Sequence, residues 1–336
     1  MSQNKETVSA IVVTYNRKKL LIECLEGLLK QTRPIDAIFL IDNFSNDGTP
    51  ELLHSKGYIN ELPPEEINKS WEKEFIYNNE VLNESIDNNI AKIEHKIPIY
   101  YVRMNENTGG AGGFHEGVKR SYESNDFDWL WLMDDDIEPE NDALQLMLDY
   151  KKISLCIHPQ KKYFDGTCVE NENFFNPVKA EKFYLYNRSF KNGKDWCSIT
   201  TGCFEGMLIH KDIVGKIGYP DKRFFIWGDD AIYGFLASLY TNTIYIKDAY
   251  FKKKIKKDIV YMNDFQLYYS LRNDFLTKSY MEDLGFYRGR SIYFYFKLLR
   301  RGLINVVKSK NIKQVYVVFK ALMDGHCKKY SKASFL

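Results

Sequence analysis

The chain has 336 residues and a formal net charge of +2, with 47 basic and 45 acidic side chains. This length allows a large buried core in one elaborated domain or two, and the near-neutral charge argues against a nucleic-acid-binding protein. The six cysteines form no C-x-x-C pair, which predicts reduced thiols and a cytoplasmic location. The polar first seven residues lack a signal core, and no apolar run approaches the roughly 18 residues of a membrane span.

Two strand–helix pairs are predicted at the start of the chain. The apolar run 8–15 is typical of a buried strand, Asn16 follows as a helix cap, and leucines recur at helical spacing up to residue 29. A second strand over 37–41 ends at Asp42 and Asn43, and Thr49-Pro50 begins a second helix. This order predicts a parallel sheet with helices on its faces, in which ligands bind beyond the carboxyl ends of the strands.

Residues 58–96 are polar and irregular, and we interpret them as an insertion that is partly helical from residue 68 to residue 93. A strand over 99–103 returns to the sheet. Four glycines then occur within the five residues 109–113, which permits positive φ and close approach of a ligand to the backbone. A helix that begins near Gly113 would direct free N–H groups toward that ligand. The glycine spacing of dinucleotide-binding and phosphate-loop motifs is absent.

The aromatic run 129–133 predicts a buried central strand, and it ends abruptly in Asp134, Asp135 and Asp136. Adjacent carboxylates are costly to bury unless a cation compensates them, and hard oxygen ligands suit Mg²⁺ or Mn²⁺. In extended chain, Asp134 and Asp136 point to one side and Asp135 to the other. The alternative is a solvated acidic turn.

A second acidic pair follows the loop-like segment 152–200. The aromatic run 224–227 leads through Gly228 to Asp229 and Asp230. Paired carboxylates held close together have divergent proton affinities, which suits a general base. The alternative is a helix that begins here, with the acids near its N-terminus.

These motifs resemble family 2 glycosyltransferases with the GT-A fold over residues 7 to 275. The resemblance rests on Val13-Thr14-Tyr15-Asn16-Arg17, Ile41-Asp42-Asn43, Asp47-Gly48-Thr49, Asn107-x-Gly-Gly-x-Gly-Gly and Asp134-x-Asp136. The glycine-rich motif is most similar to that of bacterial galactofuranosyltransferases and related rhamnosyltransferases. The resemblance implies an α/β GT-A catalytic domain over 1–250, with a mostly parallel sheet flanked by helices, and a C-terminal helical region over 251–336.

The resemblance implies inverting transfer of galactofuranose from UDP-galactofuranose to a hydroxyl of a cell-surface polysaccharide or lipid-linked glycan. The alternatives are rhamnose transfer from a dTDP donor and a nucleotide-binding pseudo-transferase. Inversion in one step needs a base for the acceptor, and Mn²⁺ or Mg²⁺ stabilises the leaving diphosphate. No nucleic-acid partner is expected.

The resemblance also implies a role for each matched residue. The nucleotide sugar is expected to contact Thr14, Asn16, Arg17, Asp42, Asn43, Arg103, Asn107, Gly109, Gly110, Asp134 and Asp135. The metal is expected on Asp134 and Asp136, the catalytic base is Asp230, and the acceptor is expected to contact Trp227, Asp229, Tyr233 and Glu205.

One departure from the family pattern concerns the metal. The family commonly has a histidine about 20 residues after the second acidic pair, and this chain has Lys252, Lys253 and Lys254 near that position. Lys252 and Arg272 are candidate diphosphate contacts. The alternative for the lysines is a solvated basic face, and the alternatives for Arg272 are bracing of the site and a salt bridge on a helix surface. Residues 287–330 mix aromatic and basic side chains, which is typical of amphipathic helices on an anionic inner membrane leaflet or of an ordinary helical subdomain.

Overall fold

The structure is a computed structural model that describes residues 6–84, 90–169, 173–184, 190, 193–255, 261–289 and 291–333. Four parallel strands form its centre in the order β4 (Ile90–Arg103), β2 (Ala37–Asp42), β1 (Val8–Thr14) and β5 (Trp129–Asp134). Their parallel pairing follows from the strand–helix alternation of the sequence, and it places their carboxyl ends at one edge. Thr14, Asp42, Arg103 and Asp134, which we predicted to contact the nucleotide sugar, end these four strands at this edge.

The outer strands make the sheet mixed rather than mostly parallel. They are β3 (Trp71–Glu84), β6 (Ile137–Pro139), β7 (Cys156–Lys162), β8 (Cys168–Val169), β11 (Trp196–Ser198), β12 (Met207–His210) and β13 (Ile244–Lys253). β12 pairs antiparallel with both β5 and β7, and β13 pairs parallel with β7. Strands β9 (Asn173–Asn176) and β10 (Glu181–Tyr184) form a separate pair. Several of these strands fall in the segment 152–200 that we had expected to be loop.

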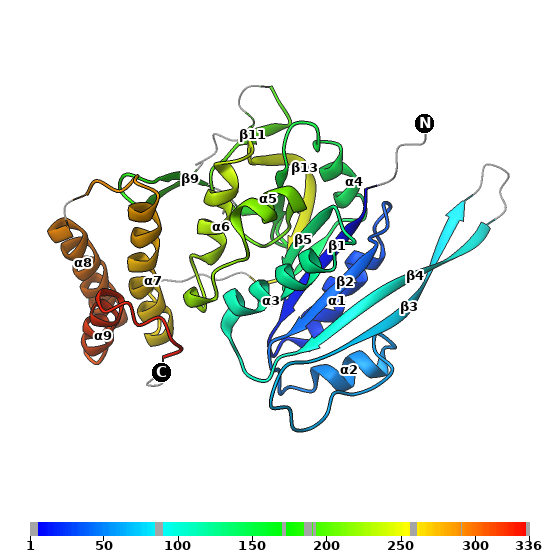
Figure 1. Ribbon diagram of the computed structural model, residues 1–336, viewed down its shortest axis with the longest axis horizontal. Coiled ribbons are helices and arrows are strands. Elements are labelled where there is room, and N and C mark those ends of the chain that lie inside the picture. The colour runs from blue at the N-terminus through cyan, green and yellow to red at the C-terminus, as the bar shows by residue number, and fades with distance from the viewer. Residues whose placement is uncertain are drawn as a thin grey trace.

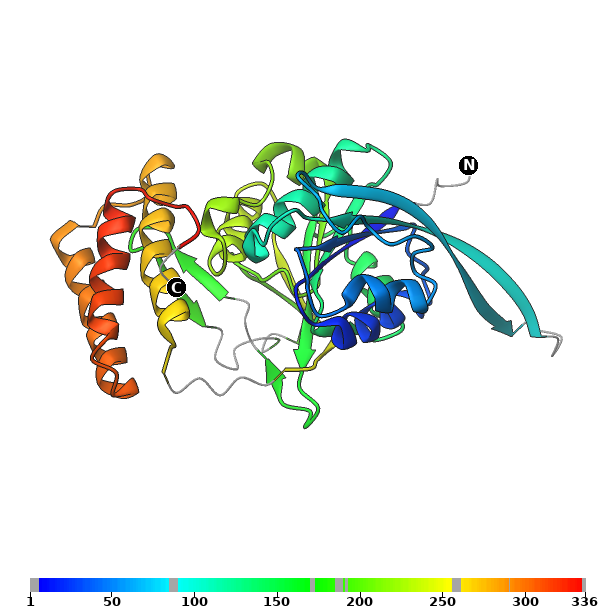
Figure 2. The ribbon, with the colours of Figure 1, turned by 90° about the horizontal axis from the view of Figure 1, so that it is seen from below.

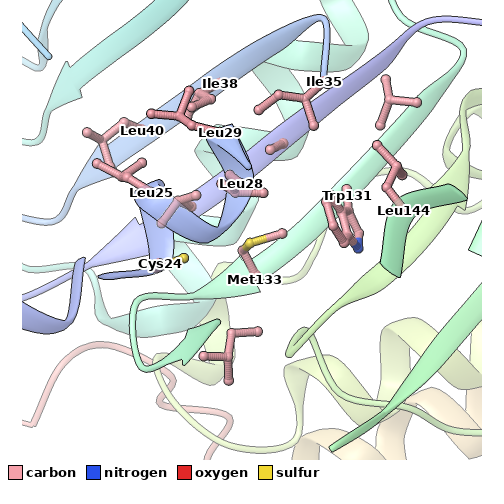
Figure 3. Packing of buried hydrophobic residues seen from close by; sticks show 14 of the residues in the cluster. Cys24, Leu25, Leu28, Leu29, Ile35, Ile38, Leu40, Trp131, Met133 and Leu144 are labelled. Carbon is pink, nitrogen blue, oxygen red and sulfur yellow. The ribbon is translucent and has the colours of Figure 1, made fainter. Parts of the chain in front are cut away.

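Helices cover both faces of the sheet, as the GT-A prediction requires. They are α1 (Lys18–Leu29), α2 (Thr49–Ser55), α3 (Gly109–Glu123), α4 (Ala143–Leu148), α5 (Lys211–Ile217) and α6 (Asp229–Ser238). Alternate residues of β5 divide between the two faces: Trp131 packs with α1 and α4, and Leu132 packs with α3, α5 and α6. Figure 3 shows Leu28 of α1 near Met133, and Leu144 of α4 near Trp131. This alternation produces three layers with two hydrophobic cores.

The prediction of a helix over 68–93 is wrong. β3 and β4 form a long antiparallel hairpin, and its ladder runs from Trp71–Arg103 to Glu84–Ile90. Phe75 is buried and Tyr77 partly buried, whereas Ile76 between them is exposed, so the inner face has the period of a strand. Pairing along its whole length with β4 satisfies the backbone of this polar segment, which its composition alone did not indicate.

Three C-terminal helices lie at the end of the molecule opposite the hairpin (Figures 1 and 2). They are α7 (Asp264–Asp283), α8 (Ser291–Ser309) and α9 (Gln314–His326), and they confirm the predicted helical extension. Leu271 and Phe275 of α7 pack against α8 and α9, and Phe225, which precedes α6, belongs to the same cluster. Within the described residues, no helix combines the length and the apolar character needed to cross a membrane.

Candidate active site

The first acidic cluster contains three carboxylates rather than two. One carboxylate oxygen from each of Asp134, Asp136 and Glu205 lies within 4.8 Å of the others. Glu205 precedes β12, whose antiparallel pairing of Met207 with Leu132 brings it to the end of β5. We had expected Glu205 to contact the acceptor, and the structure instead places it beside the predicted metal ligands. Its carboxylate could serve as a third metal ligand in a chain that lacks the histidine common in the family.

The carboxylates fit a divalent cation. Burial, together with the charges of Asp136 and Glu205, raises the pKa of Asp134 well above its usual range, and a bound cation would favour its ionised form. Lys253 forms an ion pair with Glu205, and Arg17 Nη1 lies 3.5 Å from the carboxylate of Asp136. Three hard oxygen ligands match the coordination preferences of Mg²⁺ and Mn²⁺.

Asp135 faces the other side of the strand end, toward the start of α1. Its carboxylate accepts from Thr14 Oγ1 at 2.7 Å and from Arg17 Nη1 at 3.1 Å. Burial raises the pKa of Asp135 to about 6, against the opposing charge of Arg17. Arg17 lines the same cavity as Asp134 and Asp136. The structure therefore separates the three acids into two groups, as the alternation of the strand predicts.

Several residues expected at the nucleotide are buried in the scaffold. The Asp42 carboxylate accepts from Tyr101 Oη at 2.8 Å and from Arg103 at 2.6 Å, and it is fully buried. The Asn43 Oδ1 accepts from the backbone N–H of Thr108 at 3.0 Å. These side chains thus hold the ends of β2 and β4 and the glycine-rich loop in place.

Asn16 has a φ of 53°, in the left-handed region, and its side chain accepts from the backbone N–H of Asn46 at 2.7 Å. Asn107 Oδ1 accepts from the backbone N–H of Gly109 at 2.8 Å. Both asparagines therefore fix the loops at the edge of the sheet where β1, β2 and β4 end. Tethered loops of this kind keep the floor of a ligand site in one shape.

Two adjacent glycines of the glycine-rich stretch have different surroundings, because Gly109 packs against Phe225 and Gly110 faces open space. Gly109 has a φ of +73°, and a Cβ there would lie 2.0 Å from the carbonyl oxygen of Phe225. The same carbonyl accepts from the backbone N–H of Ala111 at 3.1 Å. Gly110 has no protein atom near its Cβ position and lines the cavity. Helix α3 begins at Gly109, four residues before the predicted start.

The loop that packs on Gly109 carries the second acidic pair. Phe225, Trp227 and Gly228 all have positive φ values, and the chain then enters α6 at Asp229. Both acids lie in the first turn of this helix, as in the alternative interpretation of the sequence, and both also line a cavity of about 370 Å³. The two interpretations are therefore compatible.

This cavity joins the two acidic clusters. Its lining includes Arg17, Gly110, Asp134, Asp136, Glu205, Trp227, Asp229, Asp230 and Lys253. Asp134 and Asp136 come from the end of β5, and Asp229 and Asp230 come from the start of α6. Since both clusters face one space of small-molecule size, a single bound ligand can contact both.

Arg272 braces this loop from behind. Its Nη2 donates to the backbone carbonyls of Arg223 at 2.9 Å and Phe224 at 2.7 Å, and its side chain is fully buried. Asn273 donates from its amide to the carbonyls of Phe224, Ile226 and Trp227 at 3.0, 2.7 and 2.8 Å. Arg272 does not line the cavity, so the bracing alternative holds. We had not assigned a role to Asn273.

Two further expected residues lie outside the cavity. Tyr233 is buried, and its hydroxyl donates to the carbonyl of Gly218 at 3.1 Å. Lys252 pairs with Glu140 at 3.0 Å on the far side of β13, because successive strand residues face opposite ways. The next residue, Lys253, lines the cavity instead.

A second cavity, of about 650 Å³, adjoins the first at Trp227 and Asp230. Five polar residues of α7 line it at helical spacing: Gln266, Ser270, Asn273, Asp274 and Thr277. Lys297 and Arg301 of α8 complete this wall. The helical spacing of these polar residues is visible in the sequence. They line a cavity only because α7 packs against the rest of the protein.

The family model of glycosyl transferase family 2 matches residues 9–59 and 81–218, more than half of the chain. The chain therefore belongs to glycosyl transferase family 2, and its structure has the GT-A fold of that class.

The chain is similar to the galactofuranosyltransferase GlfT1 of Mycolicibacterium smegmatis, with 24% identity over 236 residues. The match covers 67% of this chain and 63% of that relative's length. Among solved structures, S. aureus TarS 1-349 in complex with UDP-GlcNAc has a TM-score of 0.52 at 14% identity, with 95% of this chain and 80% of that chain covered. GalNAc-T7 with UDP, GalNAc and Mn²⁺ has a TM-score of 0.51 at 13% identity, with coverage of 84% and 55%.

Proposed function

We propose that this protein is an inverting glycosyltransferase that moves galactofuranose from UDP-galactofuranose to a hydroxyl of a cell-surface polysaccharide or lipid-linked glycan. The observation that carries this proposal is the single cavity lined by both acidic clusters. One-step inversion needs a leaving-group site and a base on opposite sides of one sugar ring, and this cavity offers both.

The donor end of the cavity is the end of β5. Asp134, Asp136 and Glu205 would hold Mn²⁺ or Mg²⁺, and the ion would supply positive charge to the leaving diphosphate. Arg17 and Lys253 lie beside these acids and add fixed positive charge to the same end. Gly110 leaves room for the donor close to the backbone at the start of α3. Similarity to a galactofuranosyltransferase supports galactofuranose as the transferred sugar. The structures of TarS with UDP-GlcNAc and of GalNAc-T7 with UDP support a UDP donor.

Asp230 is the proposed base, and Asp229 the proposed partner of a second acceptor hydroxyl. The side chain of Asp230 contacts both cavities, so it lies where an acceptor in one meets a donor in the other. Its Oδ1 accepts from the backbone N–H of Ala231 at 2.6 Å, which fixes its orientation. Deprotonation of the acceptor hydroxyl by this carboxylate would raise its nucleophilicity as the bond to the diphosphate breaks.

The second cavity is the proposed acceptor site. The amide, hydroxyl and carboxylate groups along α7 suit the hydroxyls of a glycan, and the ring of Trp227 offers an apolar surface to a sugar ring. Ser270→Leu would narrow this cavity, and we expect it to raise the acceptor KM without changing hydrolysis of the donor. The location we propose is the cytoplasm, at the inner face of the cell membrane, where a lipid-linked acceptor is accessible.

The test is to incubate the purified chain separately with UDP-galactofuranose and dTDP-rhamnose, each with Mn²⁺, Mg²⁺ or a chelator, and to measure nucleotide release. We expect release of UDP that depends on the metal. Turnover of the dTDP donor alone would identify a rhamnosyltransferase. Thermal stabilisation by UDP without any turnover would indicate a pseudo-transferase, and stabilisation by neither nucleotide would overturn the transferase proposal.

A further inference from the structure

The C-terminal helices α8 and α9 each have two apolar sides, and only one of them is used inside the protein. Phe294, Leu298 and Val306 of α8 are buried against α7 and α9. Packing of an ordinary helical subdomain accounts for this side. It does not account for Ile292 and Val307 of the same helix, which are 79% and 76% exposed.

The exposed apolar residues follow the helical period. Apart from Tyr293 and Ile304, which are also exposed on α8, they are Ile292, Phe296, Leu303 and Val307 on α8, and Tyr316, Phe319 and Met323 on α9, with Ile312 just before α9. Spacings of three, four and seven residues place each set along one side of its helix. We call these eight residues the apolar stripes. Rows of exposed large apolar side chains are uncommon on soluble monomers and point to an interaction site.

Basic residues surround the stripes. Residues 287–336 contain twelve Lys and Arg but a single acidic residue, Asp324, although the whole chain has nearly equal numbers of both. Asp324 is buried and pairs with Lys320 at 2.7 Å, so it contributes little negative charge at the surface. At the turn between the helices, Lys308, Lys310 and Lys313 are exposed beside Val307 and Ile312. The region is therefore apolar and strongly cationic at once.

This combination selects one partner. We propose that the apolar stripes of α8 and α9 dock on the surface of an anionic phospholipid bilayer, with the apolar residues at the acyl boundary and the lysines among the headgroups. Helices of this composition bind membranes through buried apolar area plus attraction to anionic lipid. A second copy of this chain is a poor occupant, because a symmetric contact would face two surfaces of the same positive charge.

Docking would place the proposed acceptor cavity beside the bilayer. Lys297 and Arg301 line that cavity from α8, and Phe296 of the same helix belongs to the apolar stripes. A glycan anchored in the membrane by a lipid would then reach Asp230 along α8. This consequence rests on the proposed function, whereas binding to lipid does not.

The experiment is flotation of the full-length protein, without nucleotide, with vesicles of phosphatidylcholine alone or with about one third phosphatidylglycerol. We expect binding to the anionic vesicles that weakens as salt is raised, and little binding to neutral vesicles. The triple variant Lys308→Gln, Lys310→Gln, Lys313→Gln should bind about a hundredfold more weakly, at roughly fivefold for each charge. The matched control is Lys56→Gln, Lys69→Gln, Lys152→Gln, which removes three exposed lysines elsewhere and should bind normally.

A second pair of variants tests the apolar contribution. Phe296→Ser with Val307→Ser should also weaken vesicle binding, whereas Ile76→Ser on the exposed side of β3 should not. Circular dichroism would confirm that each variant is folded. Absence of binding to anionic vesicles, or equal binding by the variants and controls, would overturn the proposal. The proposal would also be overturned if the protein did not bind vesicles but self-associated, or bound duplex DNA, and if the same variants abolished that interaction. If the unmodified protein binds anionic vesicles but transfers no sugar, the result would contradict the proposed function and leave the membrane proposal standing.

Discussion

The side-chain amide of Asn273 donates to the backbone carbonyl of Trp227 across 2.8 Å and joins helix α7 to the loop that carries Asp230. The same amide reaches the carbonyls of Phe224 and Ile226. Two non-glycine residues of this loop, Phe225 and Trp227, have positive φ values, a conformation that persists only when its surroundings hold it. Asn273 is therefore a positioning residue for the proposed base, and it also couples the C-terminal helices to the catalytic domain.

Replacement of Asn273 tests this coupling. Asn273→Ala leaves buried carbonyls without a donor, and we expect the free energy of unfolding to fall by about 1–3 kcal/mol. Because Trp227 and Asp230 would shift relative to the donor, kcat should fall by at least about tenfold while UDP affinity stays near its original value. Thermal unfolding, steady-state kinetics and calorimetry measure the three quantities.

The control is Asn79→Ala, which removes an amide that donates to the Leu29 carbonyl at 2.8 Å, far from the cavity. It should lower stability without a comparable loss of kcat. If both variants lose stability and kcat in proportion, Asn273 has a structural role only.

Replacement of the proposed base should separate transfer from binding. Asp230→Asn keeps the shape of the side chain and its place in the first turn of α6 but removes its basicity. We expect kcat to fall by about 10²–10⁴-fold, with UDP affinity by calorimetry nearly unchanged. Asp248→Asn, at an exposed position on β13, is the matched control and should retain full turnover. Unchanged turnover of Asp230→Asn would remove the base assignment.

Glu205 should contribute to metal affinity although no motif predicts it. Glu205→Gln removes one carboxylate from the three that lie within 4.8 Å of one another. We expect Mn²⁺ affinity, measured from the electron paramagnetic resonance signal of the free ion, to fall by at least the 10–100-fold typical of changes next to metal ligands. The control is Glu138→Gln, whose carboxylate pairs with Lys254 and belongs to no such group. Equal affinities of the two variants would exclude Glu205 as a ligand.

The two adjacent glycines at the start of α3 should respond differently to alanine. Gly109→Ala introduces a Cβ against the Phe225 carbonyl at a φ of +73°, and we expect a loss of about 1–3 kcal/mol in stability because the loop must move. Gly110→Ala has open space and an ordinary φ, so its stability should be unchanged or slightly higher. Chemical denaturation compares the two. A similar stability for both would contradict the close approach of the two loops.

Stability should depend on pH through His158. Burial, with a smaller effect from the charge of Lys161, lowers the pKa of His158 to about 3 from an ordinary value near 6.5. Between these values the unfolded chain binds a proton that the folded chain does not, so this residue makes stability rise with pH. The slope should approach about 1.4 kcal/mol per pH unit below pH 6.

Denaturant unfolding at several pH values measures this slope. His158→Gln should flatten the dependence between pH 4 and pH 6, because no titratable ring remains. His54→Gln, at an exposed position on α2, should leave it unchanged. A steep dependence that survives in His158→Gln would assign the effect to other groups.

The sequence by itself determined the central elements and their order. Apolar runs and leucine spacing are local signals, so β1, α1, β2 and β5 follow from them, and the alternation of strands and helices implies parallel pairing. The sequence also predicted that Asp134 and Asp136 lie on one side of the strand end and Asp135 on the other, because side-chain direction alternates along any extended chain. The same local reasoning failed for residues 68–93, since pairing with a distant strand decided their conformation.

Only the tertiary structure decided how the site is assembled. Glu205 joins Asp134 because β12 pairs with β5, and Asn273 reaches Trp227, 46 residues earlier in the chain, because α7 packs behind the loop. Gly109 is needed for contact with Phe225 rather than for a local turn alone. No local pattern predicts such contacts, since they depend on the packing of elements that are far apart in the sequence. Packing of α7 against α8 and α9 likewise decides which apolar side of these two helices is buried and which is exposed.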